Sequence, residues 1–70
     1  MERIPVSSSN LASVGYDAAS STLEIEFHKS GVYQYFGVPQ DVHDNLMAAG
    51  SKGTYFDQFI KKAGYAYARV

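Results

Sequence analysis

Three stretches of the chain alternate between apolar and polar residues with a period of two, which is the pattern of half-buried β-strands. The clearest is residues 22–28 (TLEIEFH), where the leucine, isoleucine and phenylalanine fall on one face of an extended strand. Residues 11–17 and 32–36 are the other two predicted strands. Because only short turns separate the three, we expect them to form an antiparallel meander.

The turn between the second and third strands decides which residues face each other. We predict a three-residue loop at residues 29–31, which places Phe27 opposite Tyr33. In this register Tyr35 lies opposite Ile25, and directly opposed residues share a face of the sheet. Both tyrosines are therefore expected on the apolar face. A two-residue loop would instead put a glutamine opposite Phe27.

The first predicted strand places Val14 and Tyr16 on one face and Leu11 on the opposite face. Ahead of it, residues 1–10 hold an apolar patch interrupted by a proline, which allows at most an edge strand because proline has no N–H to donate. The serine-rich residues 7–10 that follow form either a flexible arm or a hydroxyl-lined loop.

The spacing of apolar residues becomes helical after the third strand. A first helix is predicted from Pro39, which suits a first turn, to Gly50, which suits a helix end. A second helix is predicted from a capping box of Thr54 and Asp57, and it ends at Gly64. The alternating tail, residues 65–70, is a short strand or an ordered extension. The predicted core consists of Leu23, Ile25, Phe27, Val42, Leu46, Phe56, Phe59 and Ile60.

Length and composition agree with one small domain over residues 1–70. The chain has 70 residues, of which 46% are hydrophobic and 19% charged, so the composition is that of a globular protein. The absence of cysteine excludes disulfides, thiolate metal sites and a cysteine nucleophile. The predicted fold class is α+β: a three-stranded antiparallel β-meander followed by two short helices packed on one face.

The net charge of −1 excludes a strongly basic nucleic-acid binder, but the charge is unevenly distributed. Two basic and six acidic residues give positions 1–50 a charge of −4, whereas four basic and one acidic residue give positions 51–70 a charge of +3. No apolar run approaches a membrane span, and the amino terminus lacks a basic segment followed by an apolar one. We therefore expect a soluble, cytoplasmic protein without a membrane partner.

Few residues suggest catalysis. His28 and His43 are the only imidazoles, and their spacing follows no metal-ligand pattern. Glu24 and Glu26 lie on one face of a strand, where alternating acids on the wet side are typical of a solvated surface. We expect no enzyme, no cofactor and no metal. A small hydrolase or metal enzyme built on these four residues is the least favoured hypothesis.

Aromatic and basic residues carry a stronger signal. Tyr33 and Tyr35 lie in the third strand beside Phe36, either as core residues or as a stacking platform for unpaired bases. The predicted register favours the core. In residues 51–70, cations interleave with tyrosines, which is the composition of an RNA contact surface or of a solubilised helix end.

Short motifs in a fixed order resemble the KTSC domain family. They are SS at 8–9, VGYD at 14–17, LEIEF at 23–27, GVYQY at 31–35, GVP at 37–39 and SKGTYF at 51–56. The family is named for the carboxyl-terminal extension of some lysyl-tRNA synthetases and also occurs as small proteins of bacteria and phages. The resemblance implies a module without catalytic residues, for which RNA binding is proposed. The family's central motif falls on Tyr33 and Tyr35.

The leading hypothesis is a non-catalytic binding module for RNA, either tRNA or a single strand. The alternative is a protein-interaction or accessory module of a bacterium or phage, which would use the sheet edge or the tail. The candidate RNA contacts are Lys52, Lys61, Lys62 and Arg69 for phosphates, and Tyr33, Tyr35 and Tyr65 for stacking.

Overall fold

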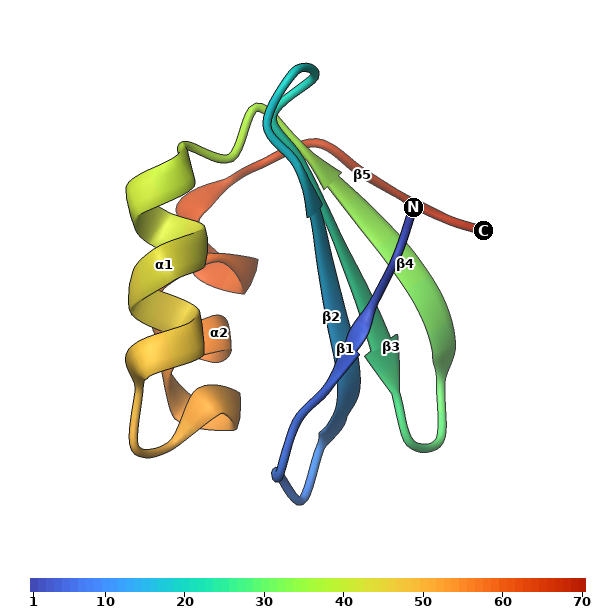
Figure 1. The fold of residues 1–70 in the computed structure, drawn as a ribbon, viewed down its shortest axis with the longest axis vertical. Helices are drawn as coiled ribbons and strands as arrows, with labels where there is room; N and C mark the ends of the chain where they lie inside the picture. The colour runs from blue at the N-terminus through green and yellow to red at the C-terminus, as the bar shows by residue number, and fades with distance from the viewer.

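A computed structural model describes all of residues 1–70 as one antiparallel sheet with two helices against one of its faces (Figure 1). The sheet order is β1-β2-β3-β4-β5, so every strand pairs with its neighbour in the sequence. The α+β class, the antiparallel meander and the helices on one face are confirmed. The elements are β1 (Ile4–Pro5), β2 (Leu11–Asp17), β3 (Thr22–Phe27), β4 (Gly31–Phe36), α1 (Gln40–Ala48), α2 (Lys52–Phe59), the 3₁₀ turn η1 (Lys61–Ala63) and β5 (Tyr67–Arg69).

The sheet has five strands, so the prediction of three was too low. β1 adds one edge by pairing Ile4 with Val14, and its proline occupies an edge position, where no ladder hydrogen bond is required of it. β5 adds the other edge by pairing Tyr67 with Tyr35 on β4. β5 is the short strand that was one of the two alternatives for the alternating tail, and β1 is the edge strand that the proline allows.

The β3–β4 register differs from the prediction by two residues. Ile25 faces Tyr33, Phe27 faces Gly31, and the loop comprises residues 28–30 instead of 29–31. Gly31 has a φ of +92°, a conformation that favours glycine and begins β4 directly after the turn. Because the side-chain period of a strand is two, a shift of two residues keeps every side chain on its face. The placement of both tyrosines on the apolar face is confirmed.

A bulge in β2 corrects the prediction for Leu11. Leu11 faces Phe27 while Ser13 faces Glu26, so β2 contains one residue more than β3 between these pairs. The extra residue returns Leu11 to the side of Val14, where it is completely buried. Strict alternation placed Leu11 on the polar face, which is wrong for this reason.

The core lies between the sheet and the helices. Phe27 and Val42 are only partly buried against it, and Phe59, predicted as a core residue, is 53% exposed. Phe59 packs on Tyr55 instead, with ring centroids 4.6 Å apart. The buried apolar residues are Leu11, Val14, Leu23, Ile25, Tyr35, Val38, Leu46, Phe56 and Ile60.

The second helix has its N-cap three residues earlier than predicted. Ser51 is its N-cap residue, and its hydroxyl donates to Thr54 Oγ1 (2.9 Å), so the expected capping box of Thr54 with Asp57 does not form. α2 ends at Phe59, and a separate 3₁₀ turn follows up to Gly64, whose φ is +88°. Neither helix has the length and apolar character needed to cross a membrane.

The sheet face opposite the helices carries a polar network. Glu24, expected to be solvated, is only 6% exposed because the N-terminal segment lies over it. Arg3 forms an ion pair with Glu24, and Gln34 Nε2 donates to Glu24 Oε1 at 2.8 Å. The hydrogen bond from Gln34, followed by the hydrogen bond and charge of Arg3, lowers the pKa of Glu24 against the opposing effect of burial. The prediction of a solvated pair of glutamates is wrong for Glu24.

Candidate functional site

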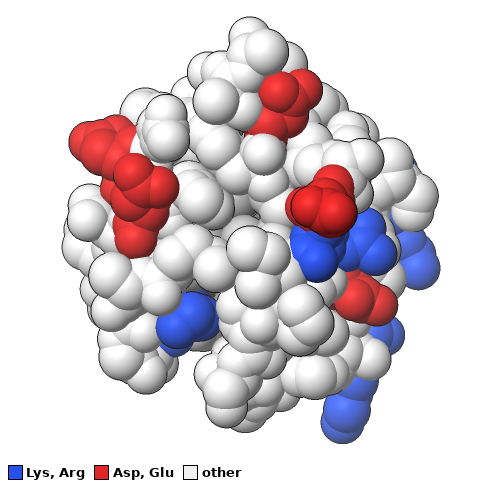
Figure 2. Space-filling model, viewed as in Figure 1, with Lys and Arg blue, Asp and Glu red and all other residues white.

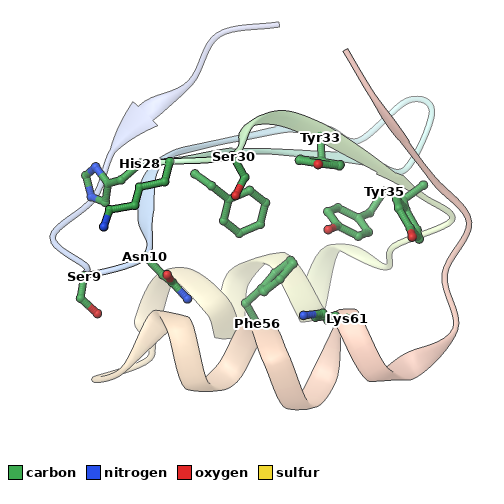
Figure 3. A pocket seen from close by; sticks show the side chains of 11 residues that line it. Ser9, Asn10, His28, Ser30, Tyr33, Tyr35, Phe56 and Lys61 are labelled. Atoms are coloured by element: carbon green, nitrogen blue, oxygen red, sulfur yellow. The ribbon is translucent and has the colours of Figure 1, made fainter.

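A cleft of about 610 Å³ opens between the sheet and α2 (Figure 3). The strands β3, β4 and β5 supply one wall and α2 the other, and the loop before β2 closes one end. We call it the aromatic cleft. Its aromatic lining residues are Phe27, Tyr33, Tyr35, Phe56 and Tyr67, and its polar ones are Ser9, Asn10, His28, Lys29, Ser30 and Lys61.

The aromatic rings form a connected cluster. Phe56 makes edge contacts with Phe27 and with Tyr35, at centroid distances of 5.3 Å in both cases. Tyr35 is 7% exposed, and burial raises the pKa of its phenol, so the phenol stays neutral well beyond neutral pH. Tyr67 covers Tyr35 at 5.5 Å and is itself 64% exposed. The cluster therefore has a buried base and an accessible outer layer.

The rim of the aromatic cleft is cationic. Lys29 and Lys61 both line it, and none of the lining residues is an aspartate or a glutamate. Arg69 lies next to this rim. Its Nη2 atom lies close to Gly31, which follows the lining residue Ser30, and would be 3.2 Å from a Cβ added to that glycine. On the face shown in Figure 2, most basic atoms lie at the right, where acidic atoms lie among them, and further acidic atoms lie at the top and over α1 at the left. The cleft therefore suits an anionic ligand with a flat ring.

The structure brings four of the seven predicted contact residues together. Tyr33, Tyr35 and Lys61 line the aromatic cleft, and Arg69 faces Tyr33 across the β4–β5 ladder. Directly opposed residues share a face of the sheet, so Arg69 lies on the side of the cleft. Tyr35 is mostly covered, which makes it a support for the outer rings.

The other three predicted contact residues lie outside the aromatic cleft. Lys52 donates to the carbonyl of Ala49 (3.2 Å) and lines a separate polar cleft of about 440 Å³ beside the serine-rich loop. Lys62 Nζ is 3.3 Å from Asp57 Oδ2, and Tyr65 packs partly buried against the core.

Eight of the eleven lining residues were not among the predicted contacts, including Tyr67, Lys29 and Asn10. Tyr67 could have been predicted, because a strand formed by the tail places Tyr67 and Arg69 on the same face. Nothing local in the sequence indicates Lys29 or Asn10, since each belongs to a turn whose position depends on the register of the whole sheet.

The two histidines have separate partners. His28 Nε2 lies 3.0 Å from the carbonyl oxygen of Ser8. His43 stacks on Tyr16 with ring centroids 4.7 Å apart, and its Nδ1 lies 3.0 Å from Asp44 Oδ1. No group of three or more His, Cys, Asp or Glu residues is arranged to hold a metal ion.

Comparison with known proteins agrees with the resemblance seen in the sequence. An uncharacterized protein of Stutzerimonas stutzeri (strain A1501) is 40% identical over 70 residues, covering 100% of this chain and 99% of that protein. A lysine–tRNA ligase of Nostoc punctiforme is 48% identical over 46 residues, which are 66% of this chain but 8% of the ligase.

The fold is also found in a crystal structure. A KTSC domain protein from Yersinia pestis is similar with a TM-score of 0.94 and 46% identity, covering 99% of this chain and 96% of that one. The sequence profile of the KTSC domain matches residues 7–67, from the serine-rich loop to β5. The chain therefore belongs to the KTSC domain family.

Proposed function

We propose that this protein is a non-catalytic module that binds single-stranded RNA in the aromatic cleft. The observation that carries the proposal is the composition of the cleft, which combines accessible aromatic rings with cations and contains no carboxylate. Proteins that bind single strands combine a positively charged groove for the backbone with aromatic side chains on which bases stack. Both parts are present in one cleft.

The stacking surface consists of Tyr33 and Tyr67. Tyr33 is half-buried and Tyr67 is 64% exposed, so each presents part of a ring to solvent. Their centroids lie 6.4 Å apart, and the rings are inclined by 52°. Such rings offer two adjacent surfaces to an unpaired base and its neighbour. Tyr35 and Phe56 hold this outer layer in place from beneath.

The phosphate contacts consist of Lys29, Lys61 and Arg69. The structure shows no salt bridge for any of the three, so their charges are not neutralised within the chain. Each phosphate contact with a single strand contributes about −0.7 to the slope of log K against log salt, so three contacts predict a slope of about −2. A neutral protein with such a local patch binds RNA weakly and loses the complex readily as salt is added.

One further observation supports the proposal. A segment similar to this chain occurs within a protein named lysine–tRNA ligase, and the name connects that relative with RNA.

The test compares two neighbouring lysines that differ in their surroundings. Lys61→Ala removes a cation from the cleft, whereas Lys62→Ala removes one that pairs with Asp57 outside it. Binding of a short uridine-rich RNA is followed by tyrosine fluorescence, since the chain has six tyrosines and no tryptophan. We expect Lys61→Ala to weaken binding and to reduce the salt slope, while Lys62→Ala binds as the unmodified protein does. Absence of binding at low salt, or equal loss in both variants, would refute the proposal.

A protein-interaction module is the second candidate function. Its support is β5, a three-residue edge strand whose residues are all exposed and whose outer side is unpaired. A peptide strand can extend such an edge through main-chain hydrogen bonds. A bound protein that resists nuclease and high salt would favour this function over RNA binding.

A further inference from the structure

Asn10 brings a free carboxamide to one end of the aromatic cleft. Its backbone is fixed on both sides, because its N–H donates to Ser8 Oγ (3.3 Å) and its carbonyl accepts from the N–H of His28 (3.0 Å). Its side-chain amide makes no hydrogen bond within the chain. In Figure 3 this side chain extends from the loop towards Phe56, into the space between the sheet and α2. The backbone of Asn10 is therefore held in position, while its side-chain amide has no hydrogen-bond partner within the chain.

No carboxylate lines the aromatic cleft, whereas the polar cleft beside the serine-rich loop, which Asn10 also lines, contains Asp57. Ser9 and Ser30, whose side chains make no hydrogen bond within the chain, contribute the only hydroxyls at the rim other than the tyrosines. His28, the remaining polar neighbour, uses Nε2 in its contact with the carbonyl of Ser8. Asn10 is thus the group in the cleft that offers an acceptor and two donors in one plane.

A base stacked on an aromatic ring turns its hydrogen-bonding edges outward within the plane of the base. A carboxamide reads such an edge by donating one hydrogen bond and accepting another. Asparagine makes this pair of bonds with adenine, donating to N7 and accepting from the N6 amino group. The positions of Asn10, Tyr33 and Tyr67 around one cleft supply both the stacking surface and the reading group.

We propose that Asn10 is a specificity-determining residue, which selects an unpaired adenine for the aromatic cleft. This inference rests on the proposed function, because it names the base that the RNA-binding cleft prefers. Lys61 and Lys29 hold the backbone without regard to sequence, and Asn10 adds the preference for one base.

The experiment uses five-nucleotide RNAs that differ only at the central position. The host is UUUUU, and its variants carry A, C or G at position three, so the number of phosphates stays constant. We expect the unmodified protein to bind UUAUU about tenfold more tightly than UUUUU, the order of discrimination that one bidentate contact provides. In Asn10→Ala we expect the same two RNAs to bind with equal affinity.

Ser9→Ala is the matched control, since Ser9 precedes Asn10 in the same loop and lines the same cleft. It is expected to keep the preference for adenine. The backbone amide signal of His28, whose N–H is bonded to Asn10, checks that the loop keeps its structure in both variants.

The possible failures are distinguishable. If none of the four RNAs binds at low salt, the proposed function itself is wrong. If all four bind with equal affinity, RNA binding stands and the role of Asn10 is refuted. A preference for any base that persists in Asn10→Ala, while the loop is intact, also overturns the inference.

Discussion

Replacing Arg3 with alanine is expected to destabilise the fold, because it leaves a buried carboxylate without its cation. Arg3 forms an ion pair with Glu24 and donates through Nε to Ser13 Oγ at 3.0 Å. The side chain of Glu24 is 8% exposed and that of Arg3 is 31% exposed. In the variant, Glu24 keeps only its hydrogen bond from Gln34.

The magnitude follows from the exposure of the pair. Removing one partner of a fully buried ion pair costs about 3–5 kcal/mol. Arg3 is partly solvated and Gln34 continues to donate to Glu24, so we expect a smaller loss of about 2 kcal/mol. In a domain of this size, that loss lowers Tm by about 8–16 °C.

The effect of Arg3→Ala depends on pH in a defined direction. The pKa of Glu24 is lowered in the folded state, so its stabilising contribution is present above the unfolded value of 4.5 and is lost as the pH falls through the folded value. Thermal unfolding followed by circular dichroism at about pH 7 and about pH 3 measures the difference between the two proteins. The difference in stability is expected to shrink at the lower pH.

Glu24→Gln is the matched variant, because its carbonyl oxygen still accepts from Gln34 while the negative charge is removed. Adding Arg3→Ala to Glu24→Gln is expected to cost clearly less than Arg3→Ala alone. An equal cost in both backgrounds, or an Arg3→Ala effect that is the same at both pH values, would show that the ion pair does not stabilise the fold.

Three other predictions follow from burial and close contacts. Gly15→Ala places a Cβ 2.6 Å from the carbonyl oxygen of Glu2, so it should displace the N-terminal segment and lower stability by about 1–3 kcal/mol; an unchanged Tm would contradict this. Phe59→Ser, at a 53% exposed site, should cost less than about 1 kcal/mol, whereas Ile60→Ala, at 1% exposure, should cost about 2–5 kcal/mol in urea unfolding. The pKa of Tyr35 is raised in the folded state, so as the pH rises the phenol ionises in the unfolded chain, near its usual pKa of 10.0, before it ionises in the folded protein, and the free energy of unfolding falls. Tyr35→Phe should therefore lose less stability than the unmodified protein above about pH 10. Alkaline melting curves that run parallel for the two proteins would contradict this.

The sequence predicted the central strands well because their faces differ in polarity. In β3, the alternation of apolar and polar residues identifies the buried face of the strand. The tyrosines of β4 lie on that same face in the predicted register and in any register shifted from it by an even number of residues. The length of the β3–β4 loop was predicted correctly, but its position was wrong by one residue. The shift places Gly31 instead of Tyr33 opposite Phe27 and exposes no apolar side chain, so the polarity pattern does not distinguish the two positions.

The edges of the sheet and the ends of the helices depend on contacts that alternation does not encode. β1 and β5 contain only two and three residues, so the sequence offered each strand as one alternative without deciding it, and both pair with the edges that β2 and β4 present. The bulge that buries Leu11 requires knowledge of both strands at once. For the same reason the candidate site was predicted by composition, through Tyr33, Lys61 and Arg69, but without the turn residue Asn10.

The chain builds four strands through short turns and then leaves the sheet for both helices before β5 returns to β4. The last strand is short and fully exposed, so it belongs to the parts of the fold that open at the lowest free energy. Opening β5 removes Tyr67 from Tyr35 and enlarges the cleft without disturbing the core beneath it. The amide protons that bond β5 and the adjacent Val70 to β4 are thus expected to exchange with solvent before those between β2 and β3.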